Sequence, residues 1–217
     1  MKNVKGVIFD LNGTLLDSMY IWHKASDRYL VSRGVTPDFN INGAAAAMSL
    51  DQVADYYQQQ YKLMGNINHI IDGITDMIDD MYAKVVLKAG VPSVLKKFKQ
   101  AGVNMCVATT ATNNYVAERA LKNNNVLQYF SDILTCSELG FGKDNAMLFN
   151  HALKKLGTCK ESTLVFEDDL TAIQTAKAAS FKVVGVYDNY AQNHQSEIQS
   201  LSDYYIKSFD DWSEMYG

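Results

Sequence analysis

The stretch that decides the fold reads VKGVIFDLNGTLLDS, from Val4 to Ser18. Its apolar part, Val4 to Phe9, predicts a short buried strand, and Asn12-Gly13 predicts a tight turn after it. Asp10 therefore stands at the carboxyl end of a strand. Because ligands of open α/β sheets bind at the carboxyl ends of strands, this acidic residue is the first candidate for chemistry.

A helical segment follows this strand. Apolar residues recur at helical spacing from Asp17 to Gly34, and a stripe from Ile67 to Met81 marks another helix. Between them, Ser49-Leu50-Asp51-Gln52 is a capping box, which predicts a helix running on to Gly65. Residues 17–82 are therefore predicted to be mostly helical.

Strands and helices alternate in the rest of the chain. The further strand candidates are short apolar runs at Val103–Ala108, Ile133–Leu134, Thr163–Phe166, Lys182–Val186 and Tyr204–Ile206. Such alternation predicts an α/β fold, a Rossmann-like, doubly wound and mostly parallel sheet. Residues 1–16 and 83–217 are predicted to form this core, with residues 17–82 inserted into it as an all-helical cap.

The composition disfavours several classes of protein. The formal net charge is -4 and the 20 Lys and Arg residues are scattered, so nucleic acid is a poor candidate partner. No apolar run reaches the about 18 residues that span a membrane. Three widely spaced cysteines indicate neither a disulfide framework nor a zinc site and favour a reducing cytoplasm. The oligomeric state stays open, and a monomer is compatible with the sequence.

Polar residues end three of the predicted strands. Asp10 follows the first, Thr109-Thr110 the second and Glu167-Asp168 another, while Lys143 lies in a glycine-containing loop. Carboxylates, a hydroxyl and an ammonium group at one edge describe a site for a phosphate and a divalent cation. Because these loops hold no His and offer oxygen ligands, Mg²⁺ fits better than Zn²⁺.

The same residues resemble the motifs of the haloacid dehalogenase superfamily, in family order and over nearly the whole chain. The D-x-D-x-T motif stands here as Asp10-Leu11-Asn12-Gly13-Thr14. The family's Ser or Thr at a strand end matches Thr109, its loop lysine matches Lys143, and its acidic pair matches Glu167-Asp168. The likeness is to the small-phosphatase and β-phosphoglucomutase branch, which implies a Rossmann-like core with a helical cap.

The resemblance implies a phosphatase acting on a small phosphorylated metabolite. Asp10 would attack phosphorus and form an aspartyl phosphate, with Lys143 offsetting the negative charge. The Thr109 hydroxyl and the backbone N–H groups of Leu11 and Thr110 would contact the phosphoryl oxygens.

The resemblance also implies a Mg²⁺ site. The side chains of Asp10 and Asp168 would be ligands, together with the backbone carbonyl of Asn12. Glu167 is a further candidate ligand, although Glu167 or Asp169 has an alternative role as a cap of the helix that begins at Leu170.

Position 12 departs from the family pattern. Active phosphatases of the family carry Asp there, and it protonates the leaving oxygen, whereas the amide of Asn12 cannot exchange a proton near neutral pH. A general acid–base contribution of roughly 10²- to 10⁴-fold should therefore be missing. Two explanations fit: an engineered variant of an active phosphatase, or a natural protein with slowed turnover or a phosphate-binding role.

Two alternatives to the phosphatase remain. One is a non-catalytic protein that binds a phosphorylated ligand. The other is a phosphosugar mutase, which is disfavoured because the cap offers few cations, such as Lys24, Arg28 and Arg33. In addition, Trp22 stands where the mutase branch places a His, and His23 is turned about 100° away on a helix.

Overall fold

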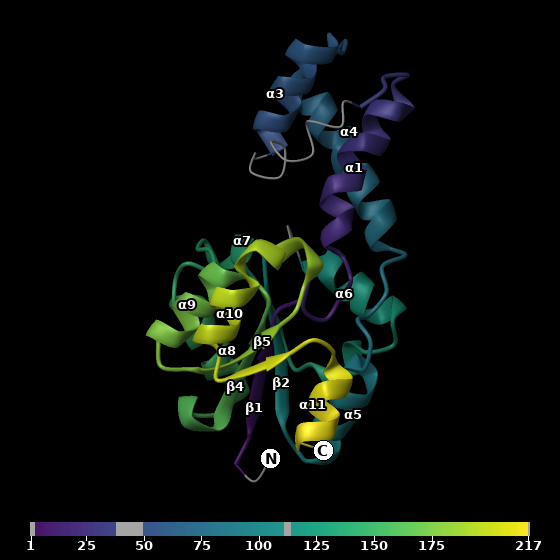
Figure 1. Cartoon of the computed structure of the whole chain (residues 1–217). Helices are drawn as coiled ribbons and strands as arrows, with labels where there is room; N and C mark the ends of the chain where they lie inside the picture. Colours follow the sequence, from purple (N-terminus) through teal and green to yellow (C-terminus); the bar gives the residue numbers. More distant parts are fainter. Residues whose placement is uncertain (1–2, 38–49, 111–113, 217) are drawn as a thin grey trace. The chain divides into compact units, whose positions relative to one another are not determined.

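The structure, a computed structural model, describes residues 3–37, 50–110 and 114–216 (Figure 1). It has two compact units: Met1–Asp17 with Val85–Gly217, and Ser18–Lys84. The capping box predicted at Ser49 and the side chains of Trp22 and His23 lie outside the description. No helix in the described part of the chain has the length and apolarity needed to cross a bilayer.

The larger unit is built on one parallel sheet, in the order β3-β2-β1-β4-β5-β6. The strands are β1 (Gly6–Phe9), β2 (Asn104–Thr109), β3 (Ile133–Thr135), β4 (Thr163–Glu167), β5 (Lys182–Val186) and β6 (Tyr204–Ile206). The chain begins in the middle of the sheet, builds one half, and returns to build the other. The strand order therefore reverses between β1 and β4, and the crevice at such a point is where doubly wound sheets bind ligands.

The register of the central strands sets which residues meet at this crevice. Phe9 is paired with Val107 of β2 and with Phe166 of β4. Asp10 therefore lies at the level of the end of β4, where Glu167 is the last strand residue. The predicted convergence of the first and fourth strand ends follows directly from this pairing.

Helices cover both faces of the sheet (Figure 1). On one face, Ile8 packs in a cluster with side chains of α8 (Met147–Leu156), α9 (Leu170–Ala178) and α10 (Gln195–Leu201). Its neighbour Phe9 points to the other face, where its ring contacts Phe98 of α5 (Val91–Gln100) and Phe209 of α11 (Phe209–Tyr216). This alternation along β1 is the period of a strand buried on both sides.

Further elements complete the larger unit. They are α6 (Asn114–Asn123), α7 (Cys136–Leu139) and the 3-10 segments Leu127–Tyr129, Lys160–Ser162 and Asn189–His194.

The smaller unit consists of α1 (Met19–Ser32), α3 (Leu50–Tyr61) and α4 (Ile67–Tyr82). Helix α4 buries Ile70, Ile74, Ile78 and Met81 of the stripe that predicted it, and also Tyr82. The prediction that the middle helix runs to Gly65 is wrong. It ends at Tyr61 because Lys62 has a φ of 52°, which is left-handed and stops a helix.

Candidate active site

Asp10 and Lys143 lie in direct contact at the crevice between β1 and β4. The backbone N–H of Asp10 donates to the carbonyl of Phe166 at 2.9 Å, which extends the strand pairing by one residue. The Asp10 side chain is 2% exposed, and its Oδ1 is 2.5 Å from Nζ of Lys143. Apart from this ion pair, neither carboxylate oxygen has a hydrogen-bond partner among the described residues.

Glu167 is the second counter-ion of Lys143. The lysine Nζ donates to both carboxylate oxygens of Glu167, at 3.0 and 2.8 Å. The Oε1 atom of Glu167 also accepts from the backbone N–H groups of Asp168 and Asp169, at 3.2 and 3.1 Å. The loop between α7 and α8 is thereby tied to the end of β4, so Lys143 reaches Asp10 from a fixed direction.

Asp168 is held by the loop that follows Asp10. The hydroxyl of Thr14 donates to Oδ1 of Asp168 at 2.7 Å, and both side chains are buried. Between Asp10 and Thr14, Gly13 has a φ of 84°, and a Cβ built on it would collide with Oδ2 of Asp168. Only glycine suits this position, because the backbone is left-handed and the carboxylate lies against it.

The buried carboxylates outnumber the cation. Burial raises the pKa of Asp168 to about 8, and the nearby charge of Asp10 raises it too, against the opposing effect of Lys143. Burial likewise raises the pKa of Glu167 well above its usual range. Burial alone lowers the pKa of Lys143, but Asp10 and Glu167 raise it more, so the lysine stays charged. The site therefore favours an additional positive charge.

The acidic residues fit a divalent cation of the Mg²⁺ type. Asp10, Glu167 and Asp168 each offer a carboxylate oxygen, and these oxygens lie within 4.8 Å of one another. Oδ2 of Asp10 is buried without a partner among the described residues, as expected of an oxygen that awaits a ligand. An oxygen-only donor set suits Mg²⁺ rather than Zn²⁺.

The other predicted residues come from the end of β2, which pairs with β1, and from the loop after Asp10. Thr109 is the buried last residue of β2, and Thr110 after it is exposed. Leu11 and Asn12 are buried in the loop after Asp10.

Asp169 caps helix α9, which is the alternative role that the sequence indicated for it. Its Oδ1 accepts from the backbone N–H of Ala172 at 2.9 Å, and it is the N-cap of α9. Glu167 does not cap that helix by this geometry, because its carboxylate is taken up by Lys143 and by the turn that follows β4.

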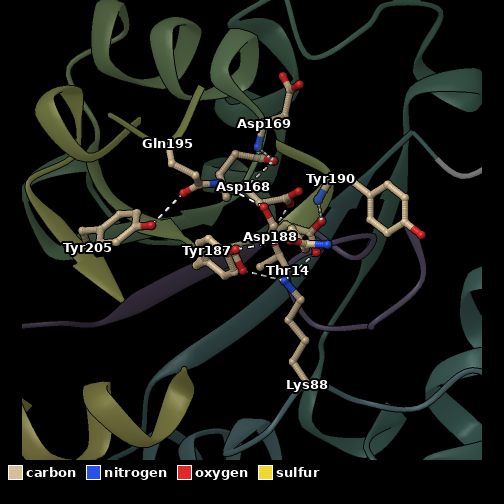
Figure 2. A network of polar contacts seen from close by, with 11 residues as sticks. Thr14, Lys88, Asp168, Asp169, Tyr187, Asp188, Tyr190, Gln195 and Tyr205 are labelled. Atoms are coloured by element: carbon tan, nitrogen blue, oxygen red, sulfur yellow. Dashed lines mark hydrogen bonds and ion pairs between the residues drawn. The ribbon is translucent and has the colours of Figure 1, made fainter. Parts of the chain in front are cut away.

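Two features escaped the sequence analysis. The contact between Thr14 and Asp168 joins residues 154 positions apart, so no local pattern reveals it. The second is a buried ion pair between Lys88 and Asp188, near Asp168 (Figure 2). Its signal was present: Asp188 is an acidic residue shortly after the apolar strand β5, as Asp10 is after β1.

Comparisons with known proteins point to one family. Residues 7–186 match the family model described as haloacid dehalogenase-like hydrolase. Phosphoglycolate phosphatase of Vibrio cholerae is 26% identical over 208 residues, which cover 91% of this chain and 90% of that protein. Validoxylamine A 7'-phosphate phosphatase of Streptomyces hygroscopicus is 24% identical over 215 residues, which cover 94% of this chain and 93% of that protein.

Solved structures share the fold at lower identity. A Thermotoga maritima protein assigned as a β-phosphoglucomutase superposes with a TM-score of 0.85 over 98% of each chain, at 18% identity. CbbY of Rhodobacter sphaeroides, solved in complex with phosphate, has a TM-score of 0.74 over 95% of each chain, at 19% identity. The predicted Rossmann-like α/β class is confirmed.

Proposed function

The chain belongs to the haloacid dehalogenase-like hydrolases, and we propose that it hydrolyses a small phosphate monoester through an aspartyl phosphate on Asp10. One observation carries the proposal: the Asp10 carboxylate is buried in contact with the ammonium group of Lys143, beside Asp168. The phosphatases among the relatives support a phosphate ester as the substrate.

The reaction proposed has two displacements at phosphorus. A carboxylate oxygen of Asp10 attacks the phosphorus atom, and the bond to the leaving oxygen breaks. Water then attacks the aspartyl phosphate, which releases inorganic phosphate and restores the carboxylate. Lys143 would lower the repulsion between the carboxylate and the phosphate dianion, and the Thr109 hydroxyl would donate to a transferring oxygen.

The proposed metal is Mg²⁺. Asp10 and Asp168 would hold it by their side chains, Asn12 by its backbone carbonyl, and Glu167 is a further candidate. When bound, it would supply positive charge for the phosphoryl oxygens. Glu167 already contacts Lys143 with both oxygens, so we assign it first to orienting that lysine.

Asn12 limits which esters turn over quickly. An amide cannot protonate the leaving oxygen, so alkyl phosphates, whose alkoxide leaves poorly, would be slow. Aryl and acyl phosphates have leaving groups that need no proton. We therefore propose reduced activity on alkyl esters in particular.

The helical unit is proposed to act as a cap. It is inserted directly after the loop that carries Asp10. A unit that closes over an active site excludes water from the reaction. Two of its cations contact aromatic rings of α1: Lys24 lies over Tyr20, and Arg33, directly after the helix, lies over Tyr29. This supports a substrate with one phosphate over the sugar bisphosphates of a mutase.

Restoring the acid tests the proposal. Asn12→Asp should raise kcat/KM for alkyl phosphates by roughly 10²- to 10⁴-fold and for aryl phosphates far less, measured as phosphate release over a panel of esters. Asn193→Asp adds the same charge at an exposed position and should change neither rate.

Each other outcome has a distinct meaning. Equal gains for both kinds of ester would contradict the missing-acid explanation. If Asn12→Asp released no phosphate from any ester yet bound phosphate, the non-catalytic binder would replace the phosphatase. Isomerisation that depends on a sugar bisphosphate would favour the mutase, whose fold the structural neighbours share.

A further inference from the structure

A second buried ion pair lies beside the acidic cluster. Nζ of Lys88 is 2.8 Å from Oδ2 of Asp188, and their side chains are 16% and 4% exposed. The same Nζ donates to the carbonyl of Tyr187 at 2.8 Å, and Oδ1 of Asp188 accepts from the backbone N–H of Tyr190 at 2.9 Å. Lys88 is thus fixed to the loop after β5 by two contacts (Figure 2).

The backbone around Lys88 is joined to the loop that carries Asp10. The N–H of Lys88 donates to the carbonyl of Leu15 at 2.9 Å. Leu16 and Leu87 form an antiparallel bridge next to it. One lysine therefore links the loop of residues 10–17, through its backbone, to the end of β5, through its side chain.

The loop of residues 10–17 needs such an anchor because it carries two groups of the site at once. Asp10 stands at its start, and Thr14, directly before Leu15, donates to Asp168. A displacement of Leu15 would move Thr14 away from the carboxylate that it orients.

We propose that Lys88 and Asp188 are positioning residues for the acidic site. Their ion pair holds the loop of residues 10–17 so that Thr14 keeps Asp168 in the arrangement that accepts a divalent cation. The part that concerns the cation rests on the proposed function, whereas the part that concerns the loop stands on the contacts alone.

Hydrogen exchange of the full chain tests the loop without any metal. In Lys88→Met, amides of residues 11–17 should exchange about tenfold faster than in the parent chain, because a charge-assisted anchor is lost. Lys177→Met is the matched control, because it removes an exposed lysine from its ion pair with Asp203. It should leave that exchange unchanged. Unchanged exchange in Lys88→Met would overturn the inference.

Calorimetric titration with Mg²⁺ tests the consequence for the site. Lys88→Met should bind Mg²⁺ about tenfold more weakly, and Lys88→Arg, which keeps the charge, should bind within about twofold of the parent chain. If the parent chain bound no Mg²⁺ while Lys88→Met still raised the exchange of residues 11–17, the proposed Mg²⁺ site would be wrong. The positioning role of Lys88 would then stand. If both chains bound Mg²⁺ equally and exchange did not change, the positioning role would be wrong.

A second variant covers the case in which Lys88→Met does not fold. Lys88→Met combined with Asp188→Asn leaves no unpaired buried charge, and the amide oxygen can still accept from Tyr190. Its loop should exchange as fast as predicted for the single variant. If the double variant kept the slow exchange of the parent chain, the inference would fail.

A cavity of about 300 Å³ borders the pair. Ethylammonium, which carries the charge that Lys88→Ala removes, should therefore slow exchange of the loop in Lys88→Ala.

Discussion

Lys143 and Lys88 are both largely buried cations of the same unit, but they face different numbers of carboxylates. Lys143 contacts Asp10 and Glu167 and lies near Asp168, whereas Lys88 contacts the single carboxylate of Asp188. The first cluster has more buried carboxyl groups than cations, and the second has one of each. An excess indicates a place where another cation binds, while a balanced pair indicates a joint between segments.

The largest effect should follow the loss of Lys143. Its cluster, with Asp10, Glu167 and Asp168, is called the unbalanced cluster here because its carboxyl groups outnumber its lysine. Lys143→Met should lower kcat/KM for phosphate release about 10³-fold, because it removes the fixed charge beside the nucleophile. The measurement is best made in the Asn12→Asp background, where rates are highest. A loss of less than tenfold would mean that Lys143 has no catalytic role, and the two lysines would then be alike.

The balanced pair should respond in stability. Lys88→Met should lower the free energy of unfolding by about 3 kcal/mol, because Asp188 is left as an unpaired buried charge. Adding Asp188→Asn should restore most of this loss, as measured by urea unfolding. A double variant no more stable than the single one would show that the pair is not the source of the loss.

Metal and pH should act on the unbalanced cluster only. In the metal-free protein the pKa of Asp168 is raised from 3.8 to about 8, so its contribution to stability is complete below pH 3.8 and is lost as the pH rises through about 8. A Mg²⁺ ion that binds Asp168 must displace the proton of its carboxyl group.

A hundredfold excess of Mg²⁺ over its Kd should stabilise the protein by about 2.7 kcal/mol. At the same Mg²⁺ concentration, the gain in Tm should be larger at pH about 8.5 than at about 6.5. An equal gain at both values would mean that Asp168 is not a ligand.

A more exposed ion pair should make the smallest contribution to the free energy of unfolding. Lys177 and Asp203 form an ion pair in which both side chains are 31% exposed. Lys177→Met should change the free energy of unfolding by at most about 1 kcal/mol, because water screens the charges. A loss as large as that of Lys88→Met would remove burial as the explanation of the difference.

The fold was predictable because its strands are short apolar runs bounded by polar residues. The runs at Lys182–Val186 and Tyr204–Ile206 are strands with those bounds, and the others differ by one or two residues. The end of α3 was not predictable, since it depends on the left-handed conformation of Lys62, a residue type that seldom adopts it.

The site was predictable in composition but not in pairing. Strand ends of a parallel sheet converge, so local patterns predicted Asp10 and Asp168, whose carboxylates the structure brings together. The role of Thr109 stays a prediction. Which oxygen Lys143 contacts, and that Thr14 holds Asp168, depends on side chains that meet only after the chain has folded. Lys88 was missed for the same reason.

The contact of Gly13 with Asp168 makes neighbouring positions unequal in their tolerance of mutation. Any side chain at position 13 would push the first loop away from the fourth strand, so selection for folding alone should keep glycine there. Asn and Asp differ at position 12 by little in volume, so a lineage can exchange them and alter its turnover while the architecture stays the same.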